Sequence, residues 1–178
     1  MANTWAMPSH IDEGRMYHLD GRHKHEENSN RGLMNAITGG FDSWDGDLTK
    51  SADKIILNNH YFEPILRDGF HDPMGKLDHT FDVREHPARV AMRLIADPGH
   101  FVIRPIHQRF VVAGRHRMVF SLEPKGPEWD ESDMAYLWRL AHEFRRPTII
   151  KSAYTAPLVA AKAVGFQTRY TIDHKPGM

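Results

Sequence analysis

The spacing of apolar residues is most regular in the C-terminal third of the chain. Within residues 130–146, apolar side chains recur at intervals of three and four, which predicts an amphipathic helix. The residues on this stripe are Met134, Leu137, Trp138, Ala141 and Phe144. Acidic residues crowd the start of the segment and Pro147 follows its end, as expected of a helix that stops there.

A strand–helix–strand unit is predicted immediately after this helix. Residues 148–154 and 167–172 have the composition of strands, and the run between them is almost uncharged. Thr155 can cap that run, and Gly165 suits the left-handed position just past its end. A helix that is apolar nearly all round must be covered by protein on several sides.

The middle of the chain, residues 54–122, is predicted to hold short strands and helices in mixed order. The first strands are 54–58 and 79–84, and the helices are 61–70 and 88–96. Three further strands, 100–104, 109–113 and 117–122, are spaced as an antiparallel meander.

Residues 1–50 are polar and punctuated by glycine, so we predict an extended arm attached to one domain spanning 51–178. Only residues 31–38 suit a short helix. The arm could wrap its own domain or lie along a neighbouring protein. Large apolar side chains in such an arm are best explained as anchors in a pocket. The predicted anchors are Trp5, Met7, Phe41 and Trp44.

Composition excludes several classes of function. Lys and Arg number 23 and so do Asp and Glu, so no global charge draws the chain to nucleic acid or to a membrane surface. No cysteine is present, which excludes disulfides and thiolate chemistry. No apolar run reaches the length of a membrane helix, so we expect a soluble protein that is cytoplasmic at synthesis.

The order of predicted elements resembles the acyl-CoA N-acyltransferase (GNAT) superfamily. The residues that carry the resemblance are ARVAMRLIADPGHFVI at 88–103 and APLVAAKAVGFQTRYTI at 156–172. It implies an α/β (α+β) fold with a mixed, mainly antiparallel sheet flanked by helices. Some short-tailed bacteriophages carry GNAT-like proteins of this size, one of them an internal virion protein, and this chain is similar to those.

The cofactor site that the resemblance implies is degenerate. The expected pyrophosphate cradle falls on residues 123–133, where Gly126 precedes Pro127 and five acids face the single base Lys125. Clustered carboxylates would repel a pyrophosphate. The position of the family's usual tyrosine acid falls on Ala161. If the chain is an enzyme, Tyr154 and Glu123 are the catalytic candidates, and Lys125 with Gly126 the cofactor-binding ones.

Two side-chain clusters leave other chemistry open. One cluster could bind zinc or nickel, and its residues are His18, His23 and His25 with Asp20, Glu26 and Glu27. Their spacing matches no closed metal site, and solvated or hydrogen-bonded histidines explain them as well. A locally basic stretch at the turns of the predicted meander could bind phosphate or an acidic partner surface, and its residues are Arg104, His107, Arg109, Arg115, His116 and Arg117. The plainer interpretation pairs that stretch with the acids of 123–133.

The function that we expect from the sequence is a non-catalytic, GNAT-like structural or interaction protein. It would bind no cofactor, and it would be part of a bacteriophage virion or an accessory protein that contacts other virion or assembly proteins through its arm. The alternatives are an N-acetyltransferase that uses acetyl-CoA on a host protein or RNA, and a small inhibitor of a host enzyme.

Overall fold

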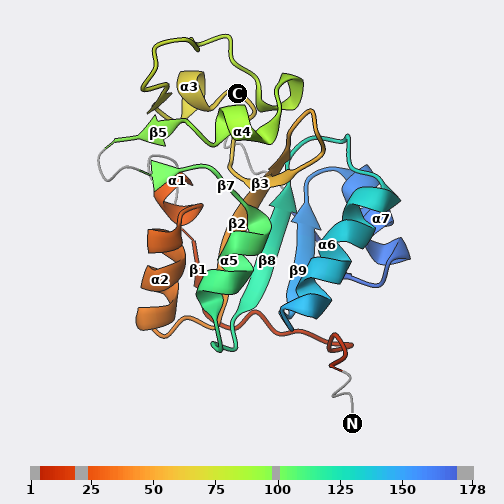
Figure 1. Ribbon diagram of the computed structural model, residues 1–178. Helices are drawn as coiled ribbons and strands as arrows, with labels where there is room; N and C mark the ends of the chain where they lie inside the picture. Colours follow the sequence, from red (N-terminus) through yellow and green to blue (C-terminus); the bar gives the residue numbers. More distant parts are fainter. Residues whose placement is uncertain (1–4, 19–23, 98–100, 172–178) are drawn as a thin grey trace, which may run out of the picture.

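A largely parallel sheet organises the computed structural model, which describes residues 5–18, 24–97 and 101–171 (Figure 1). Its strand order is β10-β9-β8-β2-β3-β7, and β1 also pairs with β2. The strands are β1 (Met16–Tyr17), β2 (Ser43–Lys50), β3 (Ile56–Asn58), β7 (Arg104–Pro105), β8 (Val119–Pro124), β9 (Thr148–Ser152) and β10 (Gln167–Tyr170). β1, β2, β8, β9 and β10 run parallel, while β3 and β7 pair antiparallel. The fold is thus α/β, and the expectation of a mainly antiparallel sheet is wrong.

Four helices cover one face of this sheet and enclose the main apolar core with it (Figure 1). They are α2 (Asn30–Thr38), α5 (Ile106–Ala113), α6 (Glu131–Glu143) and α7 (Thr155–Ala163). Strand residues of one parity, such as Trp44, Leu48, Phe120 and Leu122, pack against these helices and are fully buried. Because side chains alternate along a strand, the intervening residues point to the opposite face.

The predicted C-terminal elements are confirmed. α6 covers most of 130–146, and a capping box of Asp130 and Asp133 starts it. The strand–helix–strand unit forms β9, α7 and β10, with β9 and β10 parallel. Gly165 has φ +104°, and an added Cβ would lie 3.3 Å from the Trp138 ring. Glycine therefore suits this turn both for its backbone conformation and for the close approach of the ring.

A smaller layer lies beyond the end of the main sheet. It contains a three-stranded antiparallel sheet and four short helices. They are β4 (Phe70–His71), β5 (Ile95–Ala96), β6 (Phe101–Val102), α1 (Lys24–Glu27), α3 (Pro64–Arg67), α4 (Ala88–Ala91) and the 3-10 helix η2 (Val83–Glu85). The strand expected at 79–84 is therefore wrong, and the helix expected at 88–96 ends early and gives way to β5.

The predicted meander is also wrong, because residues 109–113 belong to helix α5. Pro105 precedes that helix, and Ile106, Phe110 and Ala113 are buried on one side of it. The strand that follows, β8, then pairs parallel with both β2 and β9 instead of antiparallel with a neighbour in the chain.

Residues expected as the end of a polar arm form β2, the strand paired with β1, β3 and β8. Trp44 in this strand is fully buried, and its indole N–H donates to the Glu27 carbonyl at 3.1 Å. Trp5 packs edge-on against His142 with ring centroids 5.0 Å apart, Phe41 does so against Tyr17, and Met7 lies against the core. All four predicted anchors therefore contact their own chain.

The N-terminal segment is bonded to the last strand of the sheet. The backbone N–H and carbonyl of Ile11 bond the Gln167 side chain at 2.8 and 3.1 Å, and Glu13 pairs with Arg169. Of the two placements left open for the segment before β1, the described part thus lies along its own domain. Among the described residues, no helix is long and apolar enough to cross a membrane.

Candidate functional site

Eight ionisable side chains meet at the carboxyl ends of β2, β8 and β9, on the face that the helices leave uncovered. Four are carboxylates, two are lysines and two are histidines: Glu27, Asp45, Asp47, Glu123, Lys125, Lys151, His18 and His60. Alternation along β2 and β8 directs Asp45, Asp47 and Glu123 to this face, and Asp47 lies beside Glu123 in the register. In open α/β sheets, ligands bind at this end of the strands.

Asp47 is the structural centre of the site. Its Oδ2 accepts from Asn28 Nδ2 at 2.9 Å and lies 2.7 Å from His60 Nδ1, while Lys125 Nζ contacts its Oδ1 at 2.8 Å. The Asp47 N–H donates to Asn28 Oδ1 at 2.8 Å, and Asn58 donates to that same oxygen at 2.6 Å. This network fixes Asp47 and orients the His60 ring.

The two carboxylate oxygens of Asp45 differ, because only Oδ2 has partners among the described residues. Its Oδ2 lies 2.7 Å from His18 Nδ1 and 2.5 Å from Lys151 Nζ. His18 Nδ1 is also 3.1 Å from Glu27 Oε1. Among the described residues, Asp45 Oδ1 is buried and has no hydrogen-bond partner. A buried carboxylate oxygen without a partner is costly, so a ligand that supplies the partner is the natural explanation.

Both lysines of the site carry a stabilised charge. Burial works against the Lys125 ammonium, but Asp47 and Glu123 outweigh it and raise its pKa above the ordinary value. Burial likewise opposes the charge of Lys151, and Asp45 together with Glu123 raises its pKa. Both ammonium groups are therefore present at neutral pH.

The donor set suits a divalent metal ion. Atoms of His18, Glu27 and Asp45 lie within 4.8 Å of one another, and carboxylate oxygens with an imidazole are ligands that Mg²⁺, Mn²⁺ and related ions accept. Four carboxylates against two ammonium groups leave a net charge of about −2 when both histidines are neutral. The bare Asp45 oxygen adds a free ligand atom.

A cavity of about 350 Å³ adjoins this site. Lys125 borders it, and its other lining residues are Lys50, Ser51, Ala52, Lys54, Phe62, Arg84, Glu128 and Trp129. Arg84 lies 4.0 Å above the Phe62 ring, and the Trp129 indole N–H donates to the Lys125 carbonyl at 2.9 Å. The cavity thus combines aromatic walls with cationic groups.

The sequence identified part of this site under its enzyme alternative. Glu123 and Lys125 are adjacent here, with Oε1 and Nζ 3.1 Å apart. Gly126 only shapes the following turn, with φ +80°, and Tyr154 is exposed at the start of α7, outside the cluster. Of the three histidines, His18 lies in the site, His25 lies in α1 and His23 falls outside the described residues.

The site residues that sequence reasoning missed are Asp45, Asp47, Lys151 and His60, whereas Glu27 was named among the acids beside the histidines. The signal for the first two was present, because residues 43–50 alternate polar and apolar side chains as a half-buried strand does. The glycine-rich surroundings led to the interpretation of this segment as an arm.

The class that fold and site define is an α/β protein with a cluster of ionisable side chains at the carboxyl ends of its parallel strands. Solved structures similar in fold include a glycerophosphodiester phosphodiesterase of Parabacteroides distasonis (TM-score 0.64, 16% identity, 90% of this chain and 66% of that one). Another is that of Thermotoga maritima (TM-score 0.61, 16% identity, 93% and 65%). A third is an Oleispira antarctica phosphodiesterase in complex with the product sn-glycerol-3-phosphate (TM-score 0.69, 18% identity, 89% and 66%).

These likenesses concern the fold, which resembles part of an α/β barrel. The chain spans about two thirds of the length of these three structures. No family model matches the chain, and no curated protein matches it. The resemblance to the GNAT superfamily is therefore wrong, and so is the expected role as a non-catalytic, GNAT-like bacteriophage virion protein. In this chain a helix that ends in Gly-Phe before a strand, α7 before β10, belongs to a parallel sheet, so the motif alone does not identify the GNAT fold.

Proposed function

We propose that this protein is a metal-dependent phosphodiesterase whose reaction takes place at the Asp45 site. The observation that carries the proposal is the bare Oδ1 of the buried Asp45 next to His18, Glu27 and Lys151. A cluster with a net negative charge and a free carboxylate oxygen attracts a divalent cation, and two ammonium groups beside it attract a phosphate.

Asp45, Glu27 and His18 would hold the metal ion. When bound, such an ion polarises a phosphoryl oxygen and lowers the pKa of a water ligand. Asp47 takes no part in this set, because Asn28, His60 and Lys125 already occupy both of its oxygens. Its role is to position His60 and Lys125.

Lys125 and Lys151 would bind the non-bridging phosphate oxygens as point charges. Hydrolysis replaces one ester P–O bond by a bond to the oxygen of water, which gives up a proton, and the departing alkoxide takes up a proton. His60 would carry out this proton exchange through Nε2, because Asp47 holds its ring through Nδ1.

Similarity of fold supports the substrate class. Two of the three solved structures named above are described as glycerophosphodiester phosphodiesterases, and the third as a phosphodiesterase in complex with the product sn-glycerol-3-phosphate. We therefore propose a glycerophosphodiester or a related small phosphodiester as substrate. The 350 Å³ cavity beside Lys125 would take the alcohol part of the molecule.

Hydrolysis of bis(p-nitrophenyl) phosphate and of glycerophosphodiesters, each with Mg²⁺, Mn²⁺ or Ca²⁺, tests the proposal. We expect turnover that a chelator abolishes and that Asp45→Asn lowers at least about 100-fold, because a metal ligand is lost. The matched control is Glu143→Gln, an exposed acid near the end of α6, which should leave turnover unchanged. Equal activity of Asp45→Asn and the wild type, or no hydrolysis of either substrate type with any of these ions, would contradict the proposal.

A further inference from the structure

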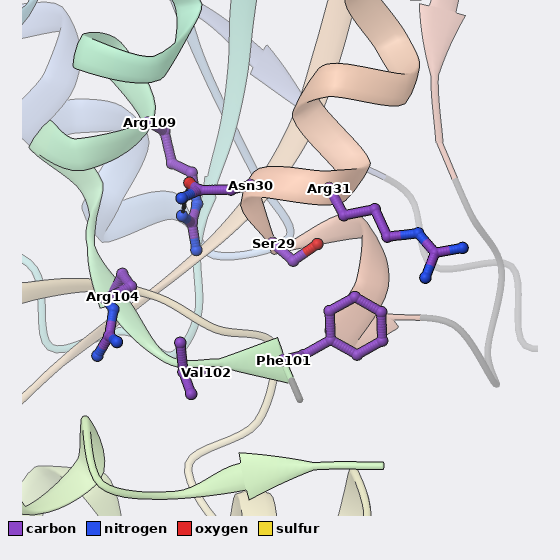
Figure 2. A pocket seen from close by; sticks show the side chains of 7 residues that line it. All are labelled: Ser29, Asn30, Arg31, Phe101, Val102, Arg104 and Arg109. Atoms are coloured by element: carbon purple, nitrogen blue, oxygen red, sulfur yellow. Dashed lines mark hydrogen bonds between the residues drawn. The ribbon is translucent and has the colours of Figure 1, made fainter. Parts of the chain in front are cut away.

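A second cavity, of about 240 Å³, lies between the N-terminal ends of α2 and α5 (Figure 2). Its lining residues are Ser29, Asn30, Arg31, Phe101, Val102, Arg104 and Arg109. Three of these are arginines and none is acidic. The volume is several times the roughly 30 Å³ that one water molecule occupies in the liquid, so a small ligand fits.

Arg109 is a buried cation to which no carboxylate of the described part of the chain is paired. Its guanidinium donates to Asn58 Oδ1 and to the Asn28 carbonyl, both at 2.8 Å, and to Asn30. Figure 2 shows it beside Asn30, at the wall of the cavity. These acceptors are neutral, so the positive charge is solvated but not balanced. Burial, and to a lesser degree Arg104, lower the pKa of Arg109 to about 9.

Arg104 is held only loosely. Its Nη1 donates to the carbonyls of Met92 and Ile103 at 3.3 and 3.5 Å, both long bonds, and no described carboxylate pairs with it. Arg31 differs, since it points away from the other two in Figure 2, is exposed, and lies 3.5 Å from Glu26. The cations available to a ligand are therefore Arg104 and Arg109.

The backbone adds to the same sign of charge. α2 and α5 both begin at this cavity, and neither has an acidic residue in its first turn. The N-terminal end of a helix carries partial positive charge and unpaired N–H groups, which favour an anion. Ser29, the cap of α2, uses its hydroxyl oxygen for the Gly32 N–H and supplies no negative charge.

We propose that this cavity binds a phosphate group, either free phosphate or a small phosphomonoester, between Arg104 and Arg109. Guanidinium groups match the geometry of phosphate oxygens, and a doubly charged anion would balance the two arginines. Phe101 and Val102 give one apolar wall, against which a short organic group of a monoester can lie. This binding is independent of the reaction at the Asp45 site and requires no metal ion.

Titration of the protein with inorganic phosphate and with methyl phosphate, followed by backbone NMR in chelator at constant ionic strength, tests this site. We expect saturable shifts at the amides of Asn30, Arg31 and Ile106. Arg104→Gln should weaken binding about tenfold or more, because a charge-assisted bond is lost. The matched control Arg115→Gln, at an exposed position just beyond α5, should bind as the wild type does.

Two comparisons separate this site from the Asp45 site. Asp45→Asn should leave phosphate affinity unchanged here, and loss of binding in that variant but not in Arg104→Gln would overturn the proposal. Absence of saturation at millimolar phosphate, or equal weakening by Arg104→Gln and Arg115→Gln, would overturn it as well. Tighter binding of methyl phosphate than of phosphate would identify a monoester as the ligand, and the reverse order free phosphate.

Discussion

The Asp45 site and the arginine cavity are both rich in charge, but they balance it in opposite ways. In the Asp45 site every lysine contacts a carboxylate, at distances from 2.5 to 3.7 Å. In the arginine cavity, Arg104 and Arg109 have only neutral acceptors among the described residues. In the first region, as far as the chain is described, a buried carboxylate oxygen, Asp45 Oδ1, lacks a partner that a cation would supply, while in the second the positive charge is unbalanced and an anion would balance it.

Asn28 links the two regions. Its side chain bonds Asp47 in the first, and its carbonyl accepts from Arg109 in the second. The same residue therefore contacts one cluster whose lysines are paired with carboxylates and one whose arginines are not. The contrast indicates that burial of charge alone does not identify a ligand site, and that the missing partner is the more informative feature.

Among the variants that test this comparison, Arg109→Met should change the free energy of unfolding most. The change removes the donor of Asn58 Oδ1, Asn30 Oδ1 and the Asn28 carbonyl in a buried setting, so we expect a loss of about 3 kcal/mol in the free energy of unfolding. Urea denaturation measures it. Arg115→Met should stay within about 0.5 kcal/mol. A small loss for Arg109→Met would mean that the cost of its unbalanced charge equals the gain from its bonds.

Lys151→Met should break the balance of the Asp45 site. It leaves the buried Asp45 with His18 as its remaining partner, and we expect about 2 kcal/mol lower stability in chelator. Because the variant cluster is more negative, added Mn²⁺ should restore stability more strongly than in the wild type. Lys162→Met, an exposed lysine on α7, is the control. If the unfolding temperature of Lys151→Met were the same with and without Mn²⁺, the result would argue against a metal site.

The two regions should also contribute to stability in opposite ways as pH rises into the alkaline range. The raised pKa of Lys151 means that its stabilisation is complete below the unfolded lysine pKa, about 10.4, and is lost as pH rises through the folded value. Arg109 has a pKa lowered to about 9, so the folded state binds fewer protons than the unfolded state above that pH, and its contribution to stability increases with pH.

Denaturation at pH 8 to 10.5, roughly the window between these pKa values, separates the contributions. The difference in unfolding free energy between wild type and Lys151→Met should stay constant up to about pH 10 and then shrink. Arg104→Gln removes one of the two causes that lower the pKa of Arg109. In this variant the free energy of unfolding should therefore begin to rise at a higher pH than in the wild type. A rise that begins at the same pH in Arg104→Gln and wild type would show that burial alone sets the Arg109 pKa.

Sequence reasoning predicted the fold best where periodic patterns are long. The stripe of α6 and the unit of β9, α7 and β10 follow from local spacing alone. The prediction for residues 109–113 failed because Phe110, Val111 and Val112 favour a strand by propensity. Burial of one helical face instead made this segment part of helix α5. Propensity is a weak prior when tertiary packing competes with it.

The site was predictable only in its local part. Glu123 and Lys125 are two residues apart on one strand, so their shared face can be deduced. Lys151 meets Asp45 across 106 positions of sequence, which requires the parallel order of β2, β8 and β9. That order in turn required residues 43–50 to be identified as a strand. One misassigned segment therefore concealed most of the site.

Arg31→Gln should have the smallest effect on stability and on phosphate affinity. It tests whether the third arginine of the cavity contributes to phosphate binding. Its side chain is 66% exposed and its pairing with Glu26 is long, so the change in unfolding free energy should be below about 0.5 kcal/mol. Phosphate affinity should fall only by the few-fold that one screened charge near the rim contributes, and by less than in Arg104→Gln. NMR titration of both variants measures the ratio. If Arg31→Gln weakened phosphate binding more than Arg104→Gln, the ligand would lie at the rim beside Glu26 and not between the two inner arginines.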